Sequence, residues 1–465
     1  MLREIKLKYF KLHKDTKLEF GKITLFIGPN NSGKSSAIHA MQLLKKELVR
    51  QGRMAESAKD MFIDIGDGSH ADNFAHRGEK SFEIEISGTV PLKNFLSDSE
   101  IGIAKKFIVG GGVQVFSSTY TLNDKGFSPK HRIIFEVDYA EDIGHKKYRI
   151  YANDYTGTEA NNPPKTTVIT ERGMSFEIFS KHGKIDIGPV RMELKGMQPN
   201  SLRYSRLPGV KKDNELLEQE YGVIYKILSS PEHLINSFHF VYPIRGLEWQ
   251  GYDIEQNKES SNLNLDNISI EKRAKSVANT FIFNRLLEDE IYEKMKEVVD
   301  VRFFAEMSTE KKVKLVSKIS KEAGIPFLFE GLGAHQMLFM LLPIVFVAKP
   351  NETIFIEEPE NHLHPKAQYE LSKLFTEIAE KEQKQLVMTT HSEHIVFGFL
   401  NQVAKKKLKK DDLKIYYFRE PEEGEAKVKE LKVNEFGQVD GGLPGFFETN
   451  LDALIDSLKA LDDSN

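Results

Sequence analysis

The order of apolar and polar residues in the first fifty positions predicts a strand, a loop and a helix. Residues 2–20 alternate charged and apolar side chains as a half-buried strand does. The run KITLFI at 22–27 is apolar throughout and rich in β-branched and aromatic residues, which is typical of a buried strand. From 35 to 50 the apolar residues return every three or four positions, as on one face of a helix.

The middle of the chain has two further patterns. Between 81 and about 190, short runs of β-branched and aromatic residues are separated by clusters of Gly, Asn and Pro, which predicts an antiparallel β-rich region. Residues 269–299 interleave charged and apolar side chains at helical spacing, which predicts one long helix that could form an arm or an interface.

After residue 323 strand and helix patterns alternate, which predicts a parallel sheet with covering helices. The expected strands are 326–329, 353–358, 385–390 and 414–418, and the expected helices are 334–347, 365–379 and 394–400.

Composition indicates an ordinary folded protein of more than one lobe. The chain has 465 residues, of which 40% are hydrophobic and 29% charged, and this length exceeds the size at which a single core usually stops growing. The net charge of −4 neither requires nor excludes nucleic acid, so any such contact would need a local basic patch.

The chain has no cysteine, which excludes disulfides, thiolate catalysis and cysteine-ligated metal centres, and fits a reducing compartment. The first ten residues carry charges where a signal peptide is apolar. The longest apolar run, 337–348, is too short to span a bilayer. We therefore expect a cytoplasmic protein without a membrane segment.

The loop between the first buried strand and the first helix reads GPNNSGKS and matches the phosphate-loop pattern G-x-x-x-x-G-K-[ST]. Lys34 is expected to reach the β- and γ-phosphates of ATP, and Ser35 to ligate Mg²⁺. The alternative is a Gly/Asn turn with an incidental lysine, which the flanking strand and helix disfavour. The expected ATP-binding residues are Gly28, Pro29, Asn30, Asn31, Ser32, Gly33, Lys34, Ser35 and Ser36.

A second buried strand, TIFIEE at 353–358, ends in two carboxylates. At the carboxyl end of a parallel strand, Glu357 could hold Mg²⁺ opposite Ser35, and Glu358 could accept a proton from the attacking water. The alternative is that both acids only stabilise the N-terminus of a following helix.

Three motifs together carry a resemblance to a family: GPNNSGKS at 28–35, FIEEPENHLHP at 355–365 and TTHS at 389–392. The set resembles the ABC/SMC-type ATPase heads, in the AAA branch close to the overcoming-lysogenization-defect (OLD) ATPases. The resemblance implies an α/β fold, namely a P-loop ATPase head with a mixed sheet that a β-rich and helical insertion interrupts. The implied division is 1–90 and 323–465 for the two parts of the head, 91–232 for the insertion, and 233–322 for a helical arm or interface.

The same resemblance implies roles for further residues. His391 would be the switch histidine that senses the γ-phosphate, and Glu360, His362 and His364 would lie in a loop that touches the opposite protomer. Taken alone, the two histidines of this loop could also suggest a metal pair.

The segment Gly331, Gly333, His335 and Gln336 is similar to the degenerate signature motif of this branch, which completes the ATP site of the other subunit. His335 stands where serine is common, which favours slow hydrolysis. The alternative for this segment is a plain helix N-terminus.

The resemblance implies an ATP-dependent dimer or larger homo-oligomer that uses Mg²⁺ and hydrolyses ATP. OLD-type chains carry a nuclease after the ATPase, but only about fifty residues follow the last expected strand, so we expect no nuclease domain in this chain. Stand-alone relatives such as PtuA of Septu and AriA of PARIS act in bacterial antiphage defence.

The leading hypothesis is therefore a sensor subunit that responds to DNA or a phage protein and controls a separately encoded effector, such as a nuclease. The alternatives are an ATP-loaded scaffold that sequesters a toxin with little turnover, and a RecF-like DNA-repair ATPase.

Overall fold

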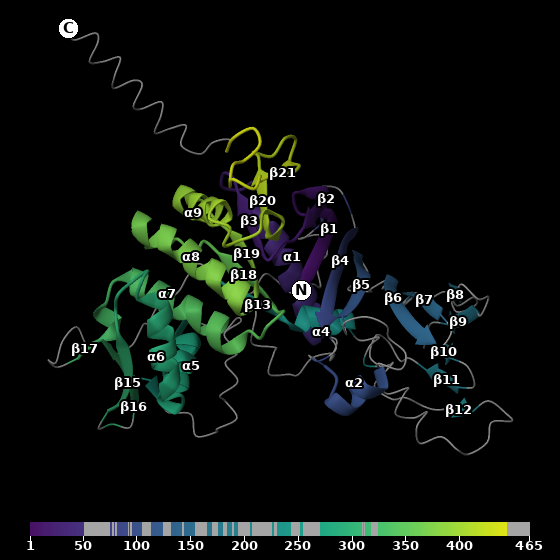
Figure 1. Cartoon of the computed structure of the whole chain (residues 1–465), viewed down its shortest axis with the longest axis horizontal. Helices are drawn as coiled ribbons and strands as arrows, with labels where there is room; N and C mark the ends of the chain where they lie inside the picture. Colours follow the sequence, from purple (N-terminus) through teal and green to yellow (C-terminus); the bar gives the residue numbers. More distant parts are fainter. Residues whose placement is uncertain are drawn as a thin grey trace, which may run out of the picture. The chain divides into compact units, whose positions relative to one another are not determined.

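A computed structural model describes the chain in residues 1–50, most of 75–104, the strands between 113 and 206, and residues 230–242, 252–253, 270–308, 312–317 and 324–443 (Figure 1). The chain divides into two compact units. The first consists of Met1–Glu19, Ser36–Phe238 and Asn351–Thr353, and the second of Phe20–Ser35, His239–Pro350 and Ile354–Asn465.

The first unit is built on an antiparallel six-stranded sheet of order β2-β1-β4-β5-β6-β7. The alternating pattern of residues 2–20 forms the hairpin β1–β2, because the chain turns at Lys11, whose φ is 49°. The β-rich pattern predicted for 81–190 is confirmed. Residues 207–225 of the predicted insertion lie outside the described residues.

The elements of the first unit are β1 (Leu2–Phe10), β2 (His13–Glu19), α1 (Lys34–Arg50, from Ser36 onward), β4 (Ser81–Pro91), α2 (Asp98–Ala104), β5 (Val113–Asn123), β6 (Arg132–Glu141), β7 (Gly144–Asn153), β8 (Lys165–Ile169), β9 (Ser175–Phe179), β10 (Lys184–Ile187), β11 (Val190–Glu193), β12 (Ser205–Arg206) and α4 (Ser230–Asn236).

The second unit is built on a mixed six-stranded sheet of order β13-β18-β19-β3-β20-β21. Strand β3 is parallel to both β19 and β20, whereas β21 is antiparallel to β20. Every residue of β3, β18 and β19 is buried, as the apolar runs predicted. These strands are β3 (Ile23–Ile27), β13 (Phe238–Val241), β18 (Thr353–Glu357), β19 (Gln385–Thr389), β20 (Leu413–Phe418) and β21 (Val428–Leu431).

Three helices of the second unit follow the C-terminal strand pattern: α7 (Leu332–Leu342), α8 (Pro365–Lys381) and α9 (Glu393–Ala404). Helices α8 and α9 pack side by side (Figure 1). Their apolar faces share one buried core with the strands, to which Leu371 of α8, Phe399 of α9 and Met388 of β19 contribute. The alternating strand and helix pattern after residue 323 is therefore confirmed.

The long helix predicted for 269–299 is wrong, because the chain forms two helices, α5 (Ile270–Phe283) and α6 (Arg285–Met295). Asn284 separates them with φ −132° and ψ 71°, and its side-chain amide donates to the Thr280 carbonyl oxygen. These helices accompany a small antiparallel sheet of β14 (Tyr252–Asp253), β15 (Phe303–Met307), β16 (Lys312–Ser317) and β17 (Ile325–Pro326).

Two predicted element bounds near α7 also need correction. The strand predicted at 326–329 is a 3₁₀ turn, Phe327–Phe329, in which Phe327 is fully buried. The helix predicted to continue to 347 changes at Pro343 into a π-helical turn, Pro343–Val347. Proline has no backbone N–H to donate to the preceding turn, which explains the change.

No helix among the described residues is long and apolar enough to cross a bilayer.

The packing of α8 on α9 gives a stability test at Gly398. A Cβ at this position would lie 2.0 Å from the Ser372 hydroxyl oxygen and 2.7 Å from the Ser372 Cβ. We expect Gly398→Ala to lower the free energy of unfolding by about 1–3 kcal/mol through overpacking, measured by urea denaturation. Gly102→Ala is the control, because nothing lies within 4 Å of its added Cβ; an unchanged midpoint for Gly398→Ala would contradict the packing.

Candidate active site

The phosphate loop lies between β3 and α1, as the sequence predicted, and its backbone requires glycine at both ends. Gly28 has φ 136°, and a Cβ there would lie 2.0 Å from the carbonyl oxygen of Phe418. Gly33 has φ 103°, and Asn31 has φ 60°. These conformations are accessible to glycine and tolerated by asparagine, and they allow backbone N–H groups to turn toward an anion.

Lys34 is buried in this loop. Its Nζ donates to the carbonyl oxygens of Gly28 at 2.9 Å and Pro29 at 2.6 Å. Burial lowers the pKa of Lys34 to about 8, against the opposing effect of Glu358 and Glu360. The side chain is thus held by two neutral acceptors, which a phosphate oxygen can replace.

Strands β18, β19 and β3 bring the two acids to the same edge of the sheet as the loop. Beyond β18, the N–H of Glu358 donates to the Thr389 carbonyl oxygen at the end of β19, at 3.0 Å. Thr390, the residue that follows β19, donates its N–H to the Phe26 carbonyl oxygen in β3. Glu357 is buried, 8% exposed, at the last position of β18.

Glu358 is held in a strained, fixed orientation. Its φ is 47°, a conformation that is rare outside glycine and that concentrates at functional sites. One carboxylate oxygen accepts a hydrogen bond from the Asn361 side-chain amide at 2.9 Å, and its carbonyl oxygen accepts one from the Gln336 amide at 3.3 Å. Sequence reasoning missed Asn361, although its position in the turn three residues after the acid was a usable signal.

The predicted switch histidine reaches the same site. The His391 side chain is exposed at the end of β19, and its pKa is lowered by partial desolvation and then by the Lys34 charge, against Glu358. The Lys34 and Glu358 charges both act on the His391 ring, so the three side chains lie within electrostatic range of one another. Ser392 caps α9, because its hydroxyl accepts the Ile395 N–H at 3.1 Å.

The segment predicted to act as a trans signature is divided between surface and core. Gly331 and Leu332 are exposed at the start of α7, whereas His335 and Gln336 are only 2% and 1% exposed. The His335 ring stacks on Phe327, with 5.1 Å between ring centroids, and its Nε2 lies 2.7 Å from the Phe327 carbonyl oxygen. Both side chains bond within their own subunit, so a contact of His335 and Gln336 with another subunit stays a prediction.

The role of Gly331 and Gly333 in the ATP site of another subunit stays a prediction. A Cβ at Gly333 would lie 2.9 Å from the His362 carbonyl oxygen, so α7 begins in close contact with the turn that follows Glu358.

The loop predicted to touch the opposite protomer is also divided. His362 and His364 are exposed, and the His364 ring caps α8 by accepting the Lys366 N–H at 3.3 Å. Glu360 is only 9% exposed, and its carboxylate accepts the His391 N–H at 2.6 Å. Glu360 thus bonds within its own chain, and contact of this loop with another protomer stays a prediction. The described residues contain no cluster of three or more candidate metal ligands.

The site fits a magnesium nucleotide. The Ser32 hydroxyl is buried in the loop and has no hydrogen-bond partner among the described residues, so the loop contains a polar atom that a ligand can satisfy. The cradle at Gly28 and Gly33, the Lys34 ammonium and the hard oxygen donors of Ser35 and Glu357 suit a triphosphate with Mg²⁺.

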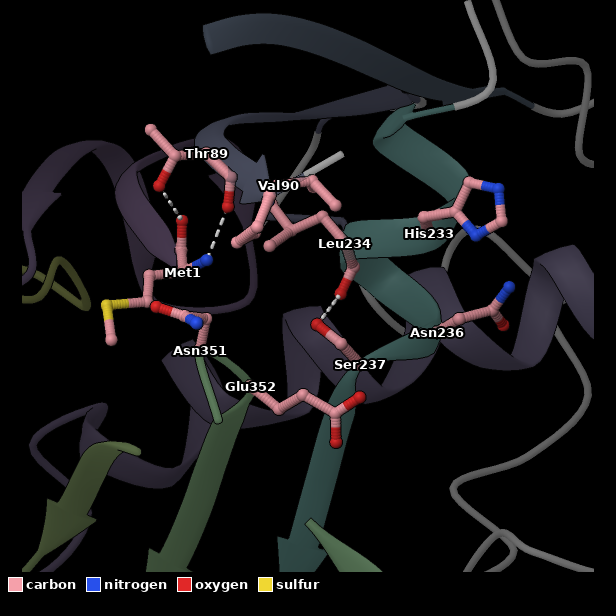
Figure 2. Close-up of a pocket in the computed structure, with 10 residues that line it drawn as sticks. Met1, Thr89, Val90, His233, Leu234, Asn236, Ser237, Asn351 and Glu352 are labelled. Atoms are coloured by element: carbon pink, nitrogen blue, oxygen red, sulfur yellow. Dashed lines mark hydrogen bonds between the residues drawn. The ribbon is translucent and has the colours of Figure 1, made fainter. Parts of the chain in front are cut away.

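A cavity lies within the first unit, away from the residues described above (Figure 2). The amino group of Met1 donates to the Thr89 carbonyl oxygen there, and the Ser237 hydroxyl donates to the Leu234 carbonyl oxygen. The lining contains none of the predicted site residues, so this cavity has no part in the nucleotide site.

Comparison with known proteins defines the class. A family model described as an AAA ATPase domain matches residues 1–396, and the chain therefore belongs to the AAA ATPase domain family. An OLD nuclease of Thermus scotoductus is 40% identical over 60 residues, which are 13% of this chain and 11% of that protein. The chain therefore matches only a small part of that relative. The expected membership of an AAA ATPase family is therefore confirmed, and the short match to the OLD nuclease agrees with the expected resemblance.

Two solved structures are similar to this chain at low sequence identity. The SMC head bound to the C-winged helix domain of ScpA has 13% identity and a TM-score of 0.42, covering 93% of this chain and 98% of that chain. The SMC head domain from Thermotoga maritima has 10% identity and a TM-score of 0.38, covering 93% and 99%.

The lowered pKa of Lys34 predicts a pH-dependent affinity for ATP. The bound phosphates require the charged lysine, so above pH 8 binding must take up a proton, and Kd should rise about tenfold between pH 7 and 9. Isothermal titration with a non-hydrolysable ATP analogue measures this. Lys34→Arg is the control, because guanidinium does not deprotonate in this range; a flat profile in the wild type, or an equal slope in the variant, would contradict the assignment.

Proposed function

We propose that this chain is an ATP hydrolase that oligomerises around ATP and acts as the sensor subunit of a bacterial antiphage system, where it controls a separately encoded effector. The observation that carries the ATPase part is the position of Lys34, Glu358 and His391 within electrostatic range of one another at one edge of the sheet. The family match supports the same activity.

The residues of the site have separate tasks in hydrolysis. Lys34 and the loop N–H groups bind the phosphates, and Ser35 and Glu357 would hold Mg²⁺, which neutralises charge that develops on the β- and γ-oxygens. Glu358, oriented by Asn361, accepts the proton of the attacking water. His391 donates or accepts a hydrogen bond at the γ-phosphate position.

Oligomerisation is supported by apolar side chains beside the N-terminus of α7. Phe329 is 65% exposed and Leu332 is 54% exposed, on either side of the exposed Gly331. Apolar side chains next to a glycine at a helix start suit contact with another subunit. We propose that a second copy of the chain binds there and that its ATP meets the Gly331 backbone.

The scaffold alternative has one sequence feature mildly in its favour, His335 in place of a serine that contacts the γ-phosphate. That feature carries less weight because the His335 ring stacks on Phe327 in the core. His335 therefore gives little reason to expect slow hydrolysis, and we favour the enzyme. The trigger that we propose is DNA or a phage protein, and the effector is a nuclease.

The enzyme hypothesis is tested by steady-state phosphate release. Glu358→Gln keeps the size of the side chain but cannot accept the proton, so we expect kcat to fall about 10²-fold or more while ATP still binds. The variant should also accumulate as an ATP-bound dimer in light scattering, because the bound nucleotide is no longer consumed. A wild type that hydrolyses no faster than Glu358→Gln would rule out the ATPase.

The defence role is tested in bacterial cells that express this chain together with the gene that lies next to its own, which we expect to encode the effector. We expect wild type to reduce phage plaques, and Lys34→Ala to lose protection because it cannot bind the phosphates. Lys366→Ala, a change at an exposed lysine outside the site, is the matched control. Equal protection by wild type and Lys34→Ala would contradict a nucleotide-controlled effector.

A further inference from the structure

A buried acid lies two residues beyond Glu358 and is not explained by the roles above. Glu360 is 9% exposed, and one of its carboxylate oxygens accepts the backbone N–H of His391 at 2.6 Å. The other carboxylate oxygen is buried without a hydrogen-bond partner among the described residues. Such a carboxyl group is costly to bury, so its retention calls for a specific task.

The task suggested by the contacts is to hold the start of the switch loop. The N–H that Glu360 binds belongs to the peptide that joins Thr390 to His391, directly after β19 ends. The Thr390 hydroxyl accepts the Ser392 N–H at 3.0 Å, which ties the two residues that flank His391 to each other. The Glu360 carboxylate therefore fixes the backbone from which the His391 ring projects.

A second link runs in parallel through Gln368 of α8. Its side-chain amide donates to the carbonyl oxygen of Leu363 at 2.8 Å, and its oxygen accepts from the Ser392 hydroxyl at 2.6 Å. The turn after Glu358 and the loop of His391 are thus joined on both sides of His391, by Glu360 before it and by Ser392 after it.

We infer that Glu360 is a positioning residue for ATP hydrolysis, which holds the His391 loop in register with the Glu358 turn. It acts through the backbone of His391 and does not touch the substrate. This inference rests on the proposed ATPase function. A loop displaced by about 1 Å can cost a large factor in rate while binding survives, because only the reacting geometry is lost.

The test compares Glu360→Ala with Glu360→Gln. The glutamine amide oxygen can still accept the His391 N–H, so Glu360→Gln should keep kcat within about threefold of wild type, whereas Glu360→Ala should lose about tenfold or more. In both variants the Kd for ATP should stay within about twofold, since the phosphate loop is unchanged. Glu370→Ala, which removes a surface partner of Lys373, is the matched control.

Hydrogen exchange of the nucleotide-free protein gives a second readout that needs no turnover. Amides in residues 389–393 should exchange faster in Glu360→Ala than in wild type, and Glu360→Gln should restore their protection.

These experiments distinguish failure of the positioning role of Glu360 from failure of the proposed ATPase function. Glu360→Gln as inactive as Glu360→Ala, with wild-type exchange at 389–393, would mean that the acid touches metal or substrate, and the positioning role would be overturned. Loss of ATP binding and of thermal stability in both variants would overturn it in favour of a purely structural role. A wild type no faster than Glu358→Gln would overturn the proposed function and the hydrolytic role together, whereas wild-type turnover with unchanged Glu360→Ala would overturn only the inference.

Discussion

The site depends on three buried strands that end at the same edge of one sheet. The backbone bonds from Glu358 to β19 and from Thr390 to β3 align their carboxyl ends. Lys34 and Glu358, more than three hundred residues apart in the chain, therefore meet in one place. Each strand is buried along its whole length, so moving either residue would expose apolar surface or break ladder bonds.

At this edge of the sheet, buried polar groups form hydrogen bonds with one another in surroundings of low dielectric constant. The Lys34 ammonium donates to loop carbonyl oxygens. The Glu358 carboxylate accepts from the Asn361 side chain, and the Glu360 carboxylate accepts from the His391 backbone N–H. Hydrogen bonds are stronger there than in water, and an unpaired group is correspondingly costly. Among the described residues, Ser32 in the phosphate loop, Glu360 in the turn after Glu358 and Gln336 of α7 each keep one buried polar atom without a hydrogen-bond partner.

Helix α7 connects this interior to the surface of the same unit. Its buried Gln336 donates to the carbonyl oxygen of Glu358, while Leu332 at its start is exposed. The start of the helix is packed against the turn at His362, which follows Glu358.

The sequence by itself determined the elements and chemistry that are local. Apolar periodicity predicted the buried strands and helices α8 and α9. The glycines, lysine and serine of the motif predicted the phosphate loop from Gly28 to Ser35. The motif at 355–365 also located the acid that lies beside Lys34.

Only the tertiary structure decided which way side chains face. Periodicity could not show the break at Asn284, since the apolar spacing continues through this residue while its backbone leaves the helical conformation. His335 and Glu360 occupy positions that motifs assign to a neighbouring subunit, yet both are buried. His335 is oriented by Phe327, which precedes its helix, and Glu360 by the backbone of His391 after the next strand, and these contacts form only when the chain folds.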